Sequence, residues 1–167
     1  CFLGACYVIG KGTKQDERTA AELFRDSAAL GFPPAQYELG LCYEHGIGLE
    51  RNMARAVELY ALAAEQEDAQ AQCALGNLYF TGNGVEQDRA RAAELYTRAA
   101  EQGDVQALSC LAECYEAGCG VPCDLDRAIA LYDQAAALGD GYAHEEASRL
   151  RLLRNNRRRK WDFESLQ

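Results

Sequence analysis

The segment LGNLYFTGNGVEQDRARAAELYTRAAEQGDVQA, residues 75–107, decides the fold because its pattern recurs along the chain. A shift of 36 residues, the separation of Leu39 and Leu75, brings identical residues into register without a slip. The aligned sets are Leu3, Leu39, Leu75 and Leu111, then Tyr7, Tyr43, Tyr79 and Tyr115, then Gly10, Gly46, Gly82 and Gly118. Self-similarity at a fixed period of this length is typical of a solenoid of stacked repeats.

Each repeat is predicted to contain two helices, because its apolar residues recur at helical spacing. The two buried stripes of one repeat are Ala35, Leu39, Cys42 and Tyr43 in the first helix, and Ala56, Leu59, Tyr60 and Ala63 in the second. The second helix is expected from Asn52 to about Gln66, with Asn52 as its N-cap. Gly46 follows the first helix, where a left-handed C-cap favours glycine. Gly40 and Gly76 lie inside helices and indicate close contact with a neighbouring helix.

The glycine pairs in GIGL and GNGV could instead suggest a nucleotide-binding loop. Such a loop follows a strand and carries a third glycine that opens a helix, and neither feature is present here. The glycines are therefore interpreted as helix ends.

The motif A-x-x-x-L-G-x-x-Y-x-x-G-x-G-V-x-x-D, followed by A-x-x-L-Y-x-x-A-A-x-x-G, resembles the Sel-1-like repeat, a relative of the tetratricopeptide repeat. The resemblance implies an all-α, right-handed superhelical solenoid of antiparallel helix pairs that acts as a scaffold or adaptor, often in bacterial signalling or host interaction. We expect four repeats within residues 1–143, at about 3–38, 39–74, 75–110 and 111–143, the first truncated at its N-terminus. Ala112 departs from the motif at the helix glycine, and Glu67 departs at the loop glycine.

A capping helix and a basic tail are expected over residues 144–167. The leucine and tyrosine of the repeat become Ala147 and Arg151, whereas Leu150 and Leu153 keep one side apolar. The ends of a solenoid require such a cap, since the last repeat has no neighbour to cover its apolar face.

The concave face of the solenoid is the predicted binding surface, because the first helices line it opposite their buried stripes. Tyr37, Leu41 and Phe80 are apolar or aromatic residues on this face, which is typical of the centre of an interface. The equal alternative is that they pack against adjacent helix ends or lie singly on the surface, as single apolar residues commonly do. The acidic residues favour a basic peptide as the ligand. The candidate residues are Tyr37, Leu41, Glu44, His45, Gln70, Asn77, Phe80, Gln106, Glu113 and Glu116.

Charge divides the chain into an acidic body and a basic tail. Residues 1–148 hold ten Lys/Arg and twenty-four Asp/Glu, a net of −14, whereas residues 149–167 hold seven and two, a net of +5. The body therefore disfavours nucleic acid as a partner. The acidic body favours a tail that binds it in cis or links two copies into a homo-oligomer, and binding to the phosphates of nucleic acid comes second. The tail could also dock a partner or link the chain to another domain. Its candidate contacts are Arg157, Arg158, Arg159, Lys160 and Trp161.

No cofactor, metal site, membrane span or catalytic residue is predicted. Cys110, Cys114, Cys119 and Cys123 do not have the spacing of a structural zinc knuckle, and the longest apolar runs are too short for a membrane helix. Cysteine-rich secreted Sel-1-like proteins that bind or hydrolyse β-lactams suggest a hydrolase as the alternative function, but no cysteine pair recurs here from repeat to repeat. A cytoplasmic location is favoured over a secreted or periplasmic one.

Overall fold

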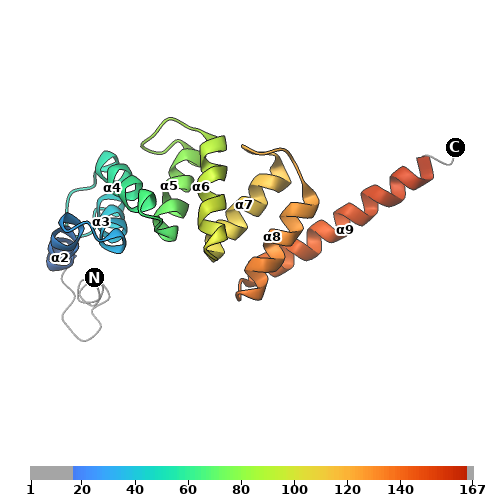
Figure 1. The fold of residues 1–167 in the computed structure, drawn as a ribbon. Helices are drawn as coiled ribbons and strands as arrows, with labels where there is room; N and C mark the ends of the chain where they lie inside the picture. The colour runs from blue at the N-terminus through green and yellow to red at the C-terminus, as the bar shows by residue number, and fades with distance from the viewer. Residues whose placement is uncertain (1–16, 165–167) are drawn as a thin grey trace.

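The computed structural model describes the backbone of residues 17–164 and the side chains of residues 17–156. This part of the chain forms eight helices and no strand, which run in sequence along one row (Figure 1). They are α2 (Glu17–Ala29), α3 (Pro33–His45), α4 (Met53–Glu65), α5 (Ala69–Thr81), α6 (Arg89–Glu101), α7 (Val105–Ala117), α8 (Leu125–Ala137) and α9 (Gly141–Glu164). The predicted all-α repeat architecture is confirmed.

Helices α3 and α4, α5 and α6, and α7 and α8 form three antiparallel pairs (Figure 1). Each second helix also packs against the first helix of the next pair, so that contacts run mainly between neighbours along the chain. The pairs begin at Pro33, Ala69 and Val105. The repeat limits taken from the sequence at 39, 75 and 111 fall inside the first helices, because a period defines the spacing of units and not where each unit begins.

The helix ends follow the expected capping chemistry. The side chain of Asn52 accepts a hydrogen bond from the backbone N–H of Arg55 at 3.1 Å, and Asp88 and Asp124 make equivalent bonds at α6 and α8. Gly46, at the end of α3, has φ of 73°, and the equivalent glycines after α5 and α7 are also left-handed. Asp68 and Asp104 cap α5 and α7 in the same way, a role that the sequence analysis did not assign.

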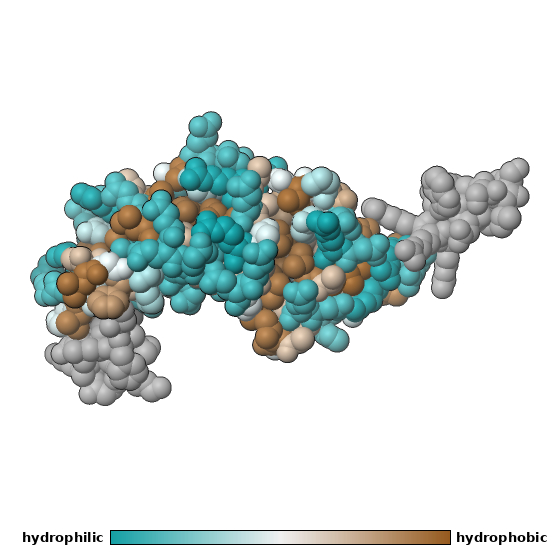
Figure 2. All heavy atoms as spheres, viewed as in Figure 1, coloured by the Kyte–Doolittle hydropathy of each residue, from teal (hydrophilic) through white to brown (hydrophobic). Residues whose placement is uncertain are grey.

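The core consists of small residues around one tyrosine per pair. Tyr60, Tyr96 and Tyr132 occupy equivalent positions and are almost fully buried among alanines. Small alanine side chains let the helices approach closely, and the tyrosine rings fill the remaining space. Cys42, which was expected on the buried stripe of the first helix, is a core residue, and Cys114 at the equivalent position is buried as well. Figure 2 shows that hydrophilic residues cover much of the visible face and divide its apolar areas.

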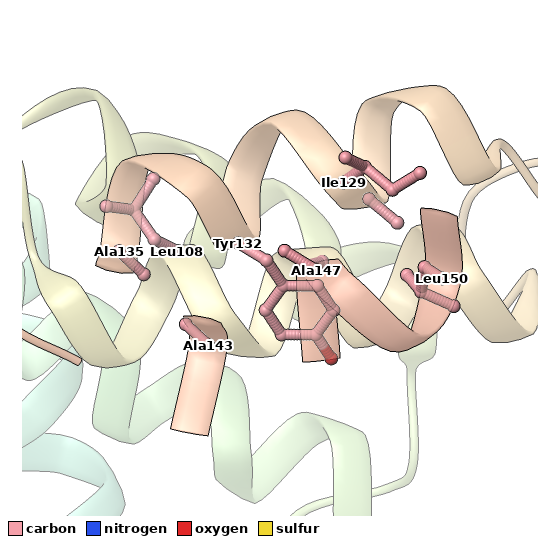
Figure 3. Packing of buried hydrophobic residues seen from close by; sticks show 9 residues of the cluster. Leu108, Ile129, Tyr132, Ala135, Ala143, Ala147 and Leu150 are labelled. Carbon is pink, nitrogen blue, oxygen red and sulfur yellow. The ribbon is translucent and has the colours of Figure 1, made fainter. Parts of the chain in front are cut away.

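Helix α9 covers the end of the last pair. It begins at Gly141, three residues before the expected start of the cap. Ala143, Ala147 and Leu150 are fully buried and lie with Tyr132 in one core cluster (Figure 3). Leu153, which was expected on the same apolar side, is 44% exposed. Among the described side chains of α9, the fully buried ones therefore lie between Ala143 and Leu150.

Candidate functional site

The first helices of three successive units enclose a cavity of about 260 Å³. We call it the first-helix pocket. Its lining residues are Tyr37, Leu41, Glu44 and His45 of α3, Gln70, Cys73, Ala74, Asn77 and Leu78 of α5, and Asp104 and Gln106 at the start of α7. Seven of the ten candidate residues chosen from the sequence meet here, although they come from helices that are separated in the chain.

The apolar wall of the first-helix pocket is anchored in the core. Tyr37 and Leu41 are half-buried and pack against the cluster around Tyr60. The rings of Tyr37 and Tyr60 lie 5.7 Å apart, a separation typical of favourable aromatic pairs. Burial, followed by the nearby carboxylate of Glu38, raises the pKa of Tyr37, so that its hydroxyl stays protonated at neutral pH and can donate a hydrogen bond.

Two polar residues of the first-helix pocket are held by tyrosines of the second helices. The hydroxyl of Tyr60 donates to Oε2 of Glu44 at 2.7 Å, and the hydroxyl of Tyr96 donates to Oδ1 of Asn77 at 2.7 Å. Both tyrosines are buried and cannot move freely, so these bonds fix the orientation of the acceptor side chains. The free oxygen of Glu44 and the amide nitrogen of Asn77 remain for a ligand.

The lining of the first-helix pocket is acidic. Glu44 and Asp104 contribute carboxylates, and no Lys or Arg is among the lining residues. Asp104 was missed from the sequence because it precedes α7 and lies off the helical face used for the prediction. Asp104 could have been predicted from its position as the N-cap of α7. An N-cap side chain lies at the start of the helix, which here is the edge of the pocket. The site can therefore accept a hydrogen-bond donor or a positive charge.

Phe80 does not line the first-helix pocket, although its helical position predicted the same face. The guanidinium of Arg89 lies 5.7 Å from its ring centre, and the ring packs against the core of the following unit. Phe80 therefore lies beside Arg89 at the start of α6 and not in the first-helix pocket. The loop that returns the chain to α6 causes this placement, and a single-helix projection does not include that loop.

Glu113 and Glu116 lie beyond the first-helix pocket, near α9. Nη2 of Arg149 contacts Oε1 of Glu116 at 2.7 Å and also pairs with Glu146. Burial, followed by the nearby Glu116 carboxylate, raises the pKa of Glu113. Glu116 is therefore occupied by an internal ion pair and does not add a free charge to the first-helix pocket.

Basic residues of α9 bind the acidic body in cis. Arg151 pairs with Asp133, and Arg154 pairs with Asp126. The tail contacts predicted from the sequence are different residues and lie outside the described side chains: Arg157, Arg158, Arg159, Lys160 and Trp161. The structure thus shows pairing between α9 and the body through three arginines that the prediction did not select.

The six cysteines between residues 17 and 156 carry free thiols. Within the described residues, no group of three or more His, Cys, Asp or Glu side chains is arranged to hold a metal ion. None of the helices formed by these residues is long and apolar enough to cross a membrane.

Consecutive helix pairs with a pocket shared by three first helices define an α-helical repeat solenoid with a candidate ligand site. The chain belongs to the Sel1 repeat family, whose sequence model matches residues 1–32, 33–68, 69–104 and 106–140. Proteins of this family are generally protein-interaction scaffolds and typically non-catalytic.

Three solved structures resemble this chain. A Sel1 repeat protein from Oxalobacter formigenes is 37% identical over 85% of the chain with a TM-score of 0.80, and a protective antigen of uropathogenic Escherichia coli is 36% identical over 85% with a TM-score of 0.79. The chain spans only 58% and 30% of those two proteins.

Cysteine-rich protein B of Helicobacter pylori is 22% identical over 81% of the chain and 98% of its own, with a TM-score of 0.63. At that identity it shows the fold alone. Comparison with curated protein sequences gave no match.

Proposed function

We propose that this protein is a scaffold that binds a partner protein by accepting a basic segment in the first-helix pocket. The observation that carries the proposal is the convergence of seven predicted residues on one acidic cavity without a lining Lys or Arg. A peptide that supplies the missing positive charge would complete the site.

The chemistry of the lining suggests how a Lys or Arg side chain would be held. Its charged end would meet the carboxylates of Glu44 and Asp104, while its methylene groups would lie against Tyr37 and Leu41. The amides of Gln70, Asn77 and Gln106 would bond to the peptide backbone. The net charge of −14 over residues 1–148 would also speed the encounter with a basic partner at low salt.

Fluorescence anisotropy with labelled peptides tests the proposal. Peptides with Lys or Arg at successive positions should bind, with affinity that falls as salt increases, whereas the same peptides with Glu in place of Lys or Arg should not. Glu44→Gln keeps an acceptor for Tyr60 but removes the charge, and Asp104→Asn keeps the N-cap of α7. Each should weaken binding about tenfold, as expected for the loss of ~1.4 kcal/mol.

Leu62→Ala supplies the matched control, because Leu62 lies on α4, is 48% exposed and does not line the first-helix pocket. Its affinity for the peptides should equal that of the unchanged protein. Equal binding by Tyr37→Ala, Glu44→Gln and the unchanged protein would remove the first-helix pocket from consideration.

A further inference from the structure

Two thiols from different repeat units meet beside the first-helix pocket. Cys73 on α5 lines the pocket and is 3% exposed, and Cys110 on α7 packs against the core cluster that contains Cys73. Sγ of Cys110 lies 3.8 Å from Oδ1 of Asn77, which is one helical turn beyond Cys73 on the same face of α5, so the two cysteines adjoin each other between α5 and α7. They do not occupy equivalent positions in their repeats, since Cys73 is equivalent to Ser109 and Cys110 to Ala74. Their contact therefore depends on how two units stack.

The surroundings of the two thiols differ. The hydrogen bond from Cys73 lowers the pKa of Cys110, against the effects of burial, Glu113 and Asp104. For Cys73, the same hydrogen bond, burial and the adjacent Asp104 all raise the pKa. Cys110 is also the more exposed of the two. Because of this exposure, Cys110 is the thiol that a small oxidant can reach first, with Cys73 as the neighbouring thiol that resolves the product.

We propose that Cys73 and Cys110 form a reversible disulfide that links α5 to α7 beside the first-helix pocket. The contact between Sγ of Cys110 and Oδ1 of Asn77 is weak, and the Cys110 side chain would lose it on turning towards Cys73. The link would join the first helices of two successive units, which no peptide segment connects directly.

The oxidant in this reaction is a small-molecule disulfide such as oxidised glutathione. The Cys110 thiolate attacks one sulfur of that disulfide, forms a mixed disulfide and releases one glutathione thiolate. Cys73 then loses its proton and attacks Sγ of Cys110, which breaks the mixed disulfide and releases the second glutathione thiolate. Two protein thiols are oxidised, one glutathione disulfide is reduced to two glutathiones, and a reducing thiol reverses both steps.

Three of the other described thiols, those of Cys42, Cys114 and Cys123, are less suited to this reaction. Burial raises the pKa of Cys42 to about 11 and that of Cys114 to about 12, so both stay protonated at neutral pH. Cys123 is exposed, and its Sγ lies 3.2 Å from the backbone oxygen of Glu116. Cys123 can be capped by glutathione, but that capping would leave a mixed disulfide and no link between α5 and α7.

The disulfide would also alter ligand binding, a consequence that rests on the proposed function. Cys73 lies on the wall of the first-helix pocket, and Asn77 of the same pocket contacts Cys110. Formation of the bond would remove that contact and tie the α5 side of the pocket to α7. Oxidation would then change the affinity for a basic peptide.

Peptide mapping of the full chain tests the link without any ligand. The protein is incubated with oxidised glutathione, its remaining thiols are blocked, and it is digested and analysed by mass spectrometry without reduction. The expected product is a peptide pair joined through Cys73 and Cys110 that disappears when a reducing thiol is added. Cys73→Ala should leave Cys110 joined to one glutathione, because the resolving thiol is missing.

Cys123→Ser is the control, since it removes an exposed thiol and should leave the Cys73–Cys110 link unchanged. Circular dichroism of each variant checks that the helices are intact, and the map of the unchanged protein needs no variant at all. The proposal is overturned if Cys110 remains a mixed disulfide in the unchanged protein, if it pairs with Cys114, or if neither Cys73 nor Cys110 reacts. Loss of peptide binding without the link would count against the proposed function alone.

Discussion

Gly76 shows why the repeat needs a glycine inside a helix. A Cβ atom at this position would lie 2.7 Å from Cε1 of Tyr96. A Cβ atom at Gly40 would lie 2.5 Å from Cε1 of Tyr60. Those rings are buried, and their hydroxyls hold Asn77 and Glu44 of the first-helix pocket. The absence of a side chain at Gly76 thus allows a core tyrosine to orient a pocket residue.

Gly76→Ala should therefore destabilise the fold despite the better helix propensity of alanine. The propensity gain is about 1 kcal/mol, whereas forcing a methyl group into packed space costs about 1–3 kcal/mol. We expect a lower urea midpoint with an unchanged slope. Gly141→Ala is the control, since nothing lies within 4 Å of a Cβ at Gly141, and its midpoint should not fall. An equal midpoint for Gly76→Ala and the unchanged protein would contradict the steric argument.

The fourth repeat has an alanine in place of the helix glycine, and its core tyrosine lacks the hydrogen bond that the other two core tyrosines make. Ala112 stands where the other units have glycine, and the buried hydroxyl of Tyr132 has no hydrogen-bond partner. A buried polar group without a partner costs about 1–3 kcal/mol, while a formed hydrogen bond contributes about 0.5–1.5 kcal/mol. Tyr132→Phe should therefore leave stability unchanged or raise it, whereas Tyr96→Phe should lower it by about 1 kcal/mol.

Parallel thermal and urea unfolding of the two tyrosine variants measures this contrast. Both substitutions remove one hydroxyl from an equivalent buried site, so each is the control for the other. A loss of stability in Tyr132→Phe as large as that in Tyr96→Phe would show that Tyr132 has a partner in solution.

At the scale of helices, glutamine pairs join the ends of α4 and α6 to the first helices of their own pairs, α3 and α5. Nε2 of Gln102 donates to Oε1 of Gln72 at 2.9 Å, and Gln66 makes the same bond to Gln36. In the next unit both members of the pair are leucines, Leu108 and Leu138. The polar pair is thus replaced as a pair, which avoids a buried amide without a partner.

A double-mutant cycle on Leu108 and Leu138 tests whether the pair acts as a unit. Leu108→Gln places an amide at a site that is 2% exposed and should lower the free energy of unfolding by about 1–3 kcal/mol. Adding Leu138→Gln supplies the partner and should recover about 0.5–1.5 kcal/mol. Leu138→Gln alone should have little effect, because Leu138 is 57% exposed. Strictly additive effects would refute the pairing.

The helices themselves were predictable from the sequence because their signals are local. Asn52 and Gly46 mark a helix start and a helix end by their own backbone chemistry, and the predicted limits of α4 agree with the structure to about one residue. The candidate site was harder to predict, since a helical projection assigns a face but not the neighbours on that face. Tyr37 reaches the first-helix pocket, whereas Phe80 shares its face and lies under Arg89.

At the scale of the whole molecule, α9 covers the last helix pair of the described residues. Tyr132 and Ile129 of α8 lie in the cluster that α9 closes with Ala143, Ala147 and Leu150 (Figure 3). Arg151 and Arg154 hold the same helix to Asp133 and Asp126 from outside the core. Exposed ion pairs contribute only about 0–1 kcal/mol each, so we infer that apolar burial supplies most of the docking free energy.

Two truncations distinguish the docked part of α9 from the rest of the helix. A chain of residues 1–154 keeps the buried residues and the paired arginines, so its melting temperature should stay within about 2 °C of that of the full chain. A chain of residues 1–140 exposes Tyr132 and Ile129, and its melting temperature should fall by ~5 °C or more. Thermal unfolding followed by circular dichroism, with size-exclusion chromatography on each chain, measures both. If the two truncated chains have the same melting temperature, α9 does not act as a cap, because a cap must stabilise the unit on which it packs.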